Sequence, residues 1–442
     1  MKTQTIQENP IQKLLSDRGN GREKGIYSCC SANEYVIKAV LKRGKEDNSC
    51  VLIESTANQC DQNGGYTGMT PKDFRDFVYR IADEMNFDCT KLFLGGDHLG
   101  PLTFAYKNEE EAMLDAEELI RCYVSAGFTK IHIDTSMRVA SDDKNTRLSD
   151  EIIAARGARL AKVAEETYAK LKEENPDAIE PVYIVGSEVP IPGGAQGGAD
   201  EGVQVTRVED FEATLEAFKK AFEKENLEKA WDNVIAVVVQ PGVEEKDAGC
   251  TEYDRTKAKE LCAAIRKYDN IVFEGHSTDY QTKIKLRELV EDGVAILKVG
   301  PGLSFAMREA LFSLAHIENI LYKEKSSHLM DVLEEAMLEE PKYWQKHYVG
   351  TEEEIALKRR YSFSDRCRYY MPNEKVAKAR ETMIHNLRKT GVPLNLLSQF
   401  MPIQYTKVRE GVLVNDPEEL IVDRIGNTVD EYLYATHQKE LF

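Results

Sequence analysis

Residues 233–242 read NVIAVVVQPG and contain an unbroken apolar run, IAVVV, at 235–239. A half-exposed strand alternates apolar and polar side chains, whereas an unbroken β-branched run is typical of a strand buried on both faces of a parallel sheet. The Pro-Gly pair at 241–242 marks the turn that ends the run. The segment therefore predicts a parallel strand with both of its faces covered.

Similar short runs recur along the chain, each followed by a turn and a helix-like stretch. The eight predicted strands are 26–30, 51–55, 91–95, 130–134, 182–187, 234–239, 271–274 and 295–299. Residues 71–85 illustrate the intervening helices, because Pro71 follows the capping residue Thr70. Eight strands alternating with helices predict an α/β fold, a (β/α)8 TIM barrel. An open doubly wound sheet also alternates in this way, but no GxGxxG motif opens the first helix.

The strand pattern ends after Leu303, and residues 305–322 are predicted to form the closing helix. We therefore divide the chain into a barrel at 1–325 and a C-terminal helical extension at 326–442. The extension carries a tyrosine-rich patch, YSFSDRCRYYMP, at 361–372. We expect this patch to pack on the barrel or to form a subunit contact.

Composition narrows the class of protein. The 442 residues are 42% apolar and 30% charged, as in ordinary globular proteins. The net charge of −18 and the lack of basic clusters disfavour nucleic-acid binding. No apolar stretch approaches the roughly 18 residues of a membrane helix, and the N-terminus lacks a secretory signal. Nine scattered cysteines without a CxxC pair indicate reduced thiols, so we expect a cytoplasmic protein.

Metal-ligating side chains follow several of the predicted strands, and barrels carry their chemistry at these C-terminal ends. The predicted metal ligands are His98, Glu188, Gln240 and His276. Imidazole and carboxylate ligands suit a divalent cation, whereas an amide is a weaker ligand, so Gln240 is left open. The ions considered are Zn, Mn, Co, Ni and Mg. The alternative for each histidine is a hydrogen-bonded structural role, which is the role expected of His132.

Carboxylates at the same strand ends are the candidate catalytic groups. Asp97, beside His98, is placed to transfer a proton, and the alternative is that it supports a metal ligand. Asp134 and Glu188 complete the predicted catalytic set.

The ends of strands 7 and 8 are where barrels commonly bind phosphate through backbone N–H groups. The candidate substrate- and phosphate-binding residues are Asn58, Ser277, Thr278, Lys298, Gly300, Gly302, Ser304 and Arg308. The alternative for the glycines is that they serve only tight turns.

These strand ends resemble the class II aldolases, metal-dependent barrels that cleave ketohexose bisphosphates. Asp97–His98 is similar to their Asp-His motif, in which the Asp is the general base and the His a metal ligand. Glu188 and His276 resemble two further ligands, and Lys298–Ser304 falls where their second phosphate loop lies. Gln240 departs from the pattern, because those enzymes carry histidine at the end of strand 6.

Longer fragments resemble one subgroup, the Z-type, non-catalytic subunit of D-tagatose-1,6-bisphosphate aldolase. The match runs from about residue 22 to the C-terminus, through IESTANQCDQNGGYTGMTP (53–71), LGGDHLGP (94–101), GSEVPIPGG (186–194), EGHSTDYQT (274–282) and YSFSDRCRYY (361–370). The resemblance implies a place in galactitol or N-acetylgalactosamine catabolism. Relatives include proteins named as tagatose-6-phosphate kinases and ketohexose-phosphate 4-epimerases. The chain has no Walker-type loop to support kinase activity.

Two functions from different classes remain open. The first is a metal-dependent 4-epimerase that interconverts tagatose 6-phosphate and fructose 6-phosphate by retro-aldol and aldol steps. The second is a non-catalytic partner of a separate aldolase subunit, which the resemblance implies. A third, an aldolase in its own right, needs Gln240 as a ligand. We expect a ketohexose phosphate as the small-molecule partner and a homo- or hetero-oligomer.

Overall fold

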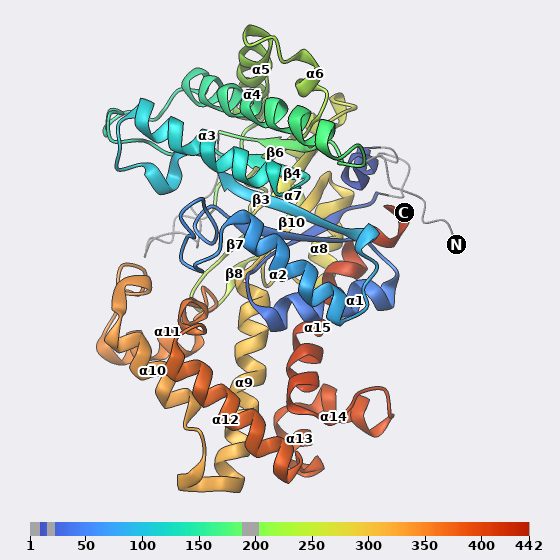
Figure 1. The fold of residues 1–442 in the computed structure, drawn as a ribbon, viewed down its shortest axis with the longest axis vertical. Helices are drawn as coiled ribbons and strands as arrows, with labels where there is room; N and C mark the ends of the chain where they lie inside the picture. The colour runs from blue at the N-terminus through green and yellow to red at the C-terminus, as the bar shows by residue number, and fades with distance from the viewer. Residues whose placement is uncertain (1–8, 16–22, 188–202, 442) are drawn as a thin grey trace.

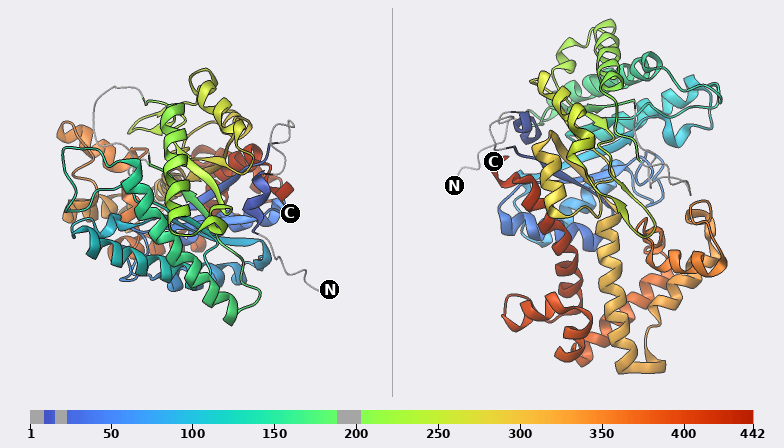
Figure 2. Two further views of the ribbon diagram at one scale, coloured as in Figure 1. Left: turned by 90° about the horizontal axis from the view of Figure 1, so that it is seen from above. Right: turned by 180° about the vertical axis from the view of Figure 1, so that it is seen from behind.

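The computed structural model describes residues 9–15, 23–187 and 203–441. Eight parallel strands form a closed barrel in the order β1-β10-β9-β6-β5-β4-β3-β2, with helices around it (Figures 1 and 2). The strands are β1 Ile26–Cys30, β2 Val51–Thr56, β3 Leu92–Leu99, β4 Lys130–Ile133, β5 Val182–Val185, β6 Val234–Val239, β9 Val272–Gly275 and β10 Val294–Val299. The predicted barrel and its eight strands are confirmed.

The third strand differs from its predicted form. It continues through the GGDH motif to Leu99, and its register with β4 shifts between Gly96 and Leu99. His98 lies at this irregularity with a left-handed φ of 52°, which is unusual for a side chain with a Cβ. Gly95 leaves room for Glu54, because a Cβ at that position would lie 2.7 Å from Glu54 Cγ. The strand therefore brings the Asp-His pair to the barrel mouth in a fixed, strained conformation.

Helices cover the outside of the barrel. They are α1 Glu34–Asp47, α2 Pro71–Glu84, α3 Glu109–Ser125, α4 Asp150–Glu174, α5 Val208–Lys224, α6 Glu228–Trp231, α7 Arg255–Ala264, α8 Lys283–Glu291 and α9 Pro301–Tyr322. Thr70 caps α2 and Pro71 occupies its first turn, as predicted, and Thr70 also forms a capping box with Asp73. The closing helix α9 begins at Pro301 instead of at 305. A two-stranded hairpin, β7 Glu244–Glu245 and β8 Cys250–Thr251, follows β6 and was not predicted.

The inside of the barrel has an apolar and a polar half. One cluster of inward side chains is apolar, most of them near the N-terminal ends of the strands, and we name this cluster the aliphatic floor: Ile26, Leu52, Phe93, Val182, Ile184, Val238, Val272 and Ile296. The short 3-10 helices η1 Pro10–Leu15 and η8 Gln438–Leu441 close it from below. Because side chains alternate with a period of two, the next residues on the same side of these strands are Ser28, Glu54 and Glu274. Polar and ionisable side chains therefore occupy the half of the interior that lies nearer the C-terminal ends of the strands.

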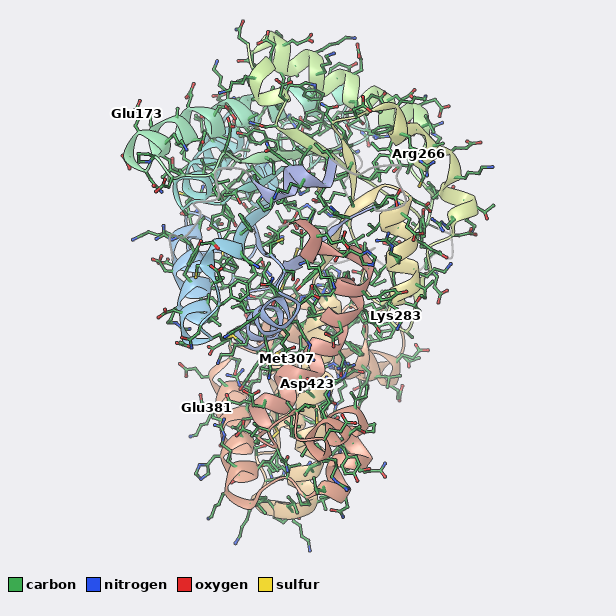
Figure 3. The ribbon with its side chains drawn as sticks, turned by 90° about the vertical axis from the view of Figure 1, so that its right-hand side faces the viewer. Glu173, Arg266, Lys283, Met307, Glu381 and Asp423 are labelled. Atoms are coloured by element: carbon green, nitrogen blue, oxygen red, sulfur yellow. The ribbon has the colours of Figure 1, made fainter. Side chains whose placement is uncertain are left out.

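The C-terminal extension projects away from the barrel and then returns to it (Figure 1). Its elements are α10 Leu329–Glu339, α11 Glu352–Tyr361, the 3-10 helix η7 Arg366–Tyr370, α12 Glu374–Thr390, α13 Leu394–Phe400, α14 Pro402–Arg409 and α15 Pro417–Thr436. Helix α15 runs alongside α9, where Figure 3 shows Asp423 near Met307, and it also contacts α1 and α8. The last helix thus belongs to the outer wall of the barrel, and the boundary at 325/326 stays a prediction.

Three side-chain contacts fix this return. The Arg43 guanidinium of α1 pairs with Asp423 and with Asp430 of α15, each at 2.8 Å. Gln438 Nε2 donates to the carbonyl oxygen of Cys50 at 2.7 Å, at the start of β2. Within the described ranges, no helix combines the length and the apolar character needed to cross a bilayer.

Candidate active site

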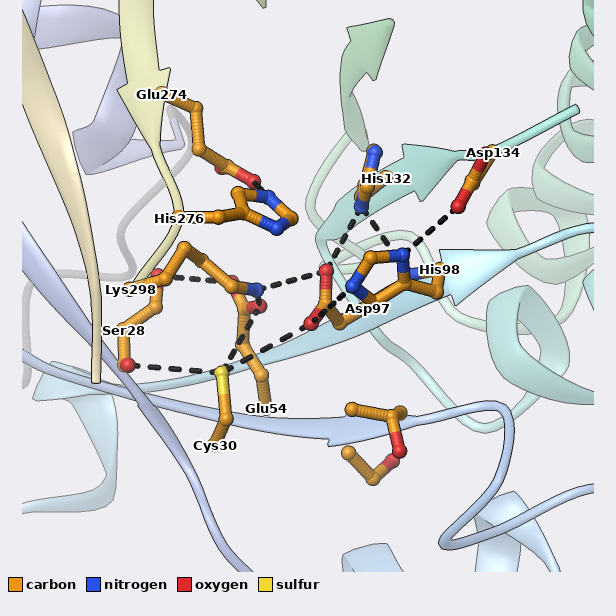
Figure 4. A network of polar contacts seen from close by, with 12 residues as sticks. Ser28, Cys30, Glu54, Asp97, His98, His132, Asp134, Glu274, His276 and Lys298 are labelled. Carbon is orange, nitrogen blue, oxygen red and sulfur yellow. Dashed lines mark hydrogen bonds and ion pairs between the residues drawn. The ribbon is translucent and has the colours of Figure 1, made fainter. Parts of the chain in front are cut away.

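A network of buried polar side chains lies at the C-terminal ends of the strands (Figure 4). Three of its contacts join a carboxylate to an imidazole: Asp134 Oδ2 to His98 Nδ1 at 2.8 Å, Asp97 Oδ1 to His132 Nδ1 at 2.8 Å, and Glu274 Oε1 to His276 Nε2 at 2.9 Å. The three ring centroids lie 5.1–5.2 Å apart. A carboxylate that accepts a hydrogen bond from one ring nitrogen leaves the other nitrogen with its lone pair exposed. The carboxylates therefore fix the orientation of all three imidazoles. Burial lowers the pKa of His98, but Asp97 and Asp134 outweigh burial and raise it, so this ring takes up a proton more readily than a free histidine.

His98 and His276 place their rings on a pocket at the barrel mouth, which Asp97 also lines. His98 turns Nε2 toward Asp97, 3.7 Å from Oδ2, and His276 turns Nδ1 away from Glu274 (Figure 4). Burial lowers the pKa of His276 to about 4, despite its bond to Glu274, so this ring is neutral at pH 7. Neutral imidazole is the form that binds metal.

His132 belongs to this network, although the sequence predicted only a satisfied barrel residue. Its Nδ1 contacts Asp97, but its buried Nε2 has no hydrogen-bond partner within the described part of the chain. Asp97, His132, Glu274 and His276 present ligand atoms that all lie within 4.8 Å of one another. The signal in the sequence was the spacing of Lys130, His132 and Asp134, which turns all three to one side of β4.

Two buried lysines balance part of the negative charge. Lys130 Nζ lies 2.7 Å from both Glu54 and Glu274, and Lys298 Nζ pairs with Glu54 and, at 2.9 Å, with Asp97. Burial by itself lowers the pKa of each lysine, but these carboxylates outweigh burial and raise it, so both stay charged. With Asp134, four carboxylates of the described network face these two ammonium groups, which leaves two negative charges before any imidazole is protonated. That excess and the oriented imidazoles fit a divalent cation.

Asp97 is the carboxylate with access to both the network and the pocket. Burial raises its pKa, but His98, Lys298 and the hydrogen bond from His132 outweigh burial and hold the pKa well below the usual range. It is therefore ionised at neutral pH and able to accept a proton. Asp134 contacts His98 and does not line the pocket, so its placement suits orientation of the ring.

Two further residues, Glu188 and Gln240, were predicted as metal ligands. Glu188 lies outside the described residues. Gln240 does not line the pocket, and its Oε1 accepts hydrogen bonds from the backbone N–H groups of Gly242 and Val243 at 2.8 and 2.9 Å. The amide oxygen expected at a metal is thus used to close the turn after β6.

The predicted phosphate residues separate into two groups. Asn58, Ser277, Lys298 and Gly300 line the pocket, whereas Thr278, Gly302, Ser304 and Arg308 do not. The N–H groups of Gly300 and Gly302 both donate to Asp279 Oδ1, at 3.0 and 2.7 Å. Burial, with Glu245 nearby, raises the pKa of Asp279 to about 7. An internal carboxyl group therefore occupies the donors expected to bind phosphate.

The sequence also missed part of the pocket wall. Arg368 and Tyr369 of the extension line it, next to Cys30 and Tyr66 of the barrel. Burial raises the pKa of the Cys30 thiol well above its usual value, so this group stays protonated.

The family model described as "D-tagatose-1,6-bisphosphate aldolase subunit GatZ/KbaZ-like" matches residues 11–437. The chain belongs to this family. The resemblance of the sequence fragments is confirmed by this match over nearly the whole chain.

The chain is also similar to proteins of known structure. A protein from Sinorhizobium meliloti 1021, named a "probable tagatose 6 phosphate kinase", is 43% identical with a TM-score of 0.85, over 93% of this chain and 100% of that one. The YdjI aldolase from Escherichia coli K12 is 12% identical with a TM-score of 0.39, over 84% and 98% of the two chains. The epimerase UxaE from Cohnella laeviribosi is 11% identical with a TM-score of 0.44, over 92% and 81%. Similarity at the level of the last two says nothing about the activity of this chain.

Proposed function

We propose that this protein is itself an enzyme, a divalent-metal-dependent 4-epimerase that interconverts D-tagatose 6-phosphate and D-fructose 6-phosphate. The observation that carries the proposal is the pair of pocket imidazoles, His98 and His276, each held by its own carboxylate beside the ionised Asp97. The family description names a tagatose bisphosphate, and the similar protein from S. meliloti carries tagatose 6-phosphate in its name. Those names support the choice of substrate class.

The chain's own residues suit a divalent cation at the pocket. His98 and His276 would hold it, together with Glu188 as the predicted carboxylate ligand, and nitrogen with carboxylate oxygen suits Zn, Mn or Co. When bound, such a cation polarises the carbonyl group of a ketose. Asp134 and Glu274 hold the two rings in place for this role.

The proposed reaction is a bond cleavage that reverses on the opposite face. Asp97 accepts the proton of the C4 hydroxyl group, and C4 becomes the aldehyde carbon of glyceraldehyde 3-phosphate. The electrons of the broken C3–C4 bond stay on the three-carbon dihydroxyacetone fragment. After the aldehyde presents its other face, the bond forms again and Asp97 returns the proton. Atoms and electrons balance without an oxidant, and Lys298 and His132 keep Asp97 in place.

The second candidate is the non-catalytic subunit of a tagatose-1,6-bisphosphate aldolase. The observation that favours it is the family description, which calls these proteins aldolase subunits. A role in stability alone does not need the buried network, because burying charges is costly and the aliphatic floor shows that this barrel can be filled with apolar side chains.

The test is an assay of the purified full-length protein with tagatose 6-phosphate, after chelation and after Mn²⁺ or Zn²⁺ is restored. We expect fructose 6-phosphate to form only when metal is present. Accumulation of triose phosphates would instead indicate an aldolase. No conversion with either metal would overturn the proposal and favour the accessory subunit, which should then raise the activity of an added catalytic aldolase subunit.

A matched pair of variants assigns the proton transfer. Asp97→Asn keeps the size of the side chain but cannot accept the proton, so kcat/KM should fall by about 10²- to 10⁴-fold. Asp232→Asn changes an exposed aspartate just before β6, at the opposite end of the barrel, and should behave like the wild type. Equal activity in the two variants would contradict the role of Asp97.

A further inference from the structure

The extension reaches the barrel mouth through the tyrosine-rich patch. Ser362 Oγ donates to Asp247 Oδ1 at 2.8 Å, in the β7–β8 hairpin. The rings of Phe363 and Tyr280 stack with their centroids 4.0 Å apart. Within the single chain, this segment therefore packs on barrel loops, and it carries Arg368 into the pocket wall.

Lys298 and Arg368, the lysine and the arginine that line the pocket, differ in which groups compensate their positive charge. Lys298 pairs with Glu54 and Asp97. Arg368 instead donates to neutral oxygens: the carbonyl groups of Ser364 and Asp365, the latter at 2.9 Å, and Tyr369 Oη at 2.9 Å. Over the described residues, no carboxylate side chain forms an ion pair with Arg368. Its positive charge is therefore available to a ligand.

Ser304 and Arg308, two of the residues predicted to bind phosphate, contact Asp365, which precedes Arg368 in the chain. Asp365 has a left-handed φ of 44° and accepts from Ser304 Oγ at 2.5 Å and from Arg308 Nε at 3.3 Å. The Arg308 guanidinium also lies over the ring of Phe305, 4.0 Å from its centroid. Helix α9 thus anchors the start of η7, and with it the position of Arg368, without entering the pocket itself.

The expected phosphate donors at the end of β10 are not free. Gly300 and Gly302 direct their N–H groups at Asp279, and Glu245 adds a second carboxyl group to the same pocket wall. An anionic substrate group needs a cation elsewhere in the pocket. Arginine presents several N–H groups in one plane, which suits phosphate better than a single ammonium group does.

We infer that Arg368, from the C-terminal extension, binds the anionic group at the far end of the sugar substrate, and that this group is a phosphate. The inference rests on the proposed function for the identity of the sugar. The shared chemistry is recognition of an anion by a guanidinium, which a carboxylate at C6 also satisfies. Ser304, Arg308 and Asp365 are positioning residues, because they act through η7.

The test measures equilibrium binding by titration calorimetry of the full-length protein with fructose 6-phosphate, fructose and fructuronate. The titrations are run with Mn²⁺ and after chelation, and the chelated protein gives binding in the absence of turnover. Arg368→Gln removes charge-assisted hydrogen bonds, so the affinity for fructose 6-phosphate should fall by about 10- to 100-fold while the affinity for fructose stays the same. The affinity of Arg368→Lys for fructose 6-phosphate should lie between those of the wild type and Arg368→Gln. The control Arg388→Gln alters an exposed arginine of α12, which pairs with Asp416 outside the pocket, and should bind like the wild type.

Several results would overturn the inference. They are unchanged binding of fructose 6-phosphate in Arg368→Gln, an equal loss for fructose, no binding of fructose 6-phosphate by the wild type, or a preference for fructuronate that depends on Arg368. An unchanged thermal unfolding midpoint in Arg368→Gln would show that a loss of binding is local. Binding that depends on Arg368 without any epimerisation would sustain the inference while the proposed function fails, so the two are tested separately.

Discussion

The two halves of the barrel interior share one set of strands and differ in what the strands turn inward. The aliphatic floor is filled with side chains such as Ile26 and Leu52. Two residues further along the same strands stand Ser28 and Glu54, within a network of lysines, carboxylates and imidazoles. The floor shows that strands of this barrel can be packed with apolar side chains alone. The network costs desolvation energy that close pairing must offset, so its presence points to chemistry at the barrel mouth.

The largest loss of stability is expected when a buried lysine of the network is replaced. Lys130→Met leaves Glu54 and Glu274 without a shared buried partner, so the free energy of unfolding should fall by about 3–5 kcal/mol. Urea-induced unfolding followed by circular dichroism measures the change. Lys229→Met is the matched control, because its partner Glu180 lies 3.9 Å away and its side chain is 86% exposed. Stability equal to that of the control would show that the buried pairing is dispensable.

A second buried ion cluster, on the outer wall, sharpens the comparison because it faces no substrate pocket. Burial raises the pKa of Asp423, but Arg43, Lys407 and Gln404 outweigh burial and lower it. A lowered pKa in the folded state stabilises the protein above the unfolded aspartate pKa of about 3.9, and this stabilisation disappears as the pH falls through the folded value.

Asp423→Asn should therefore lower the free energy of unfolding by about 1–3 kcal/mol at pH 7. The difference from the wild type should shrink once the pH falls below about 4, because both side chains are then uncharged in the unfolded state and Asp423 becomes protonated in the folded state. Unfolding curves at several pH values measure this. A difference that stays constant down to pH 2.5 would count against an ionic role, and turnover should be the same in both proteins at pH 7.

The smallest loss of stability is expected for a substitution in the aliphatic floor. Ile26→Val removes one buried methylene group and should cost about 0.5–1.5 kcal/mol of unfolding free energy, as measured in urea. Metal-dependent turnover should be unchanged, because the side chain lies below the network. A marked loss of turnover in this variant would show that the two halves are coupled.

Much of the site could be predicted from the order of residues in the chain. Asp97, His98 and His276 closely follow the ends of their predicted strands, so placing the strands placed these side chains at one rim, although the third strand itself continues to Leu99. Lys130 and His132 were missed because they stand within a strand, where a charged or aromatic polar side chain is expected to be exceptional. Arg308 was expected in the pocket because it lies one helical turn beyond the glycine loop, yet it faces Asp365 instead.

The sequence by itself determined the architecture of this protein, since unbroken apolar runs alternating with amphipathic helices have few stable packings besides a closed barrel. It also determined which side chains follow the strands at the mouth, such as Asp97, His98 and His276, because the end of a parallel strand is a local property. Only the tertiary structure decided how they pair: that Gln240 caps a turn, that Asp279 binds the glycine N–H groups, and that Arg368 enters the pocket. Such pairings join residues far apart in the chain, and packing geometry, not spacing in the sequence, selects them.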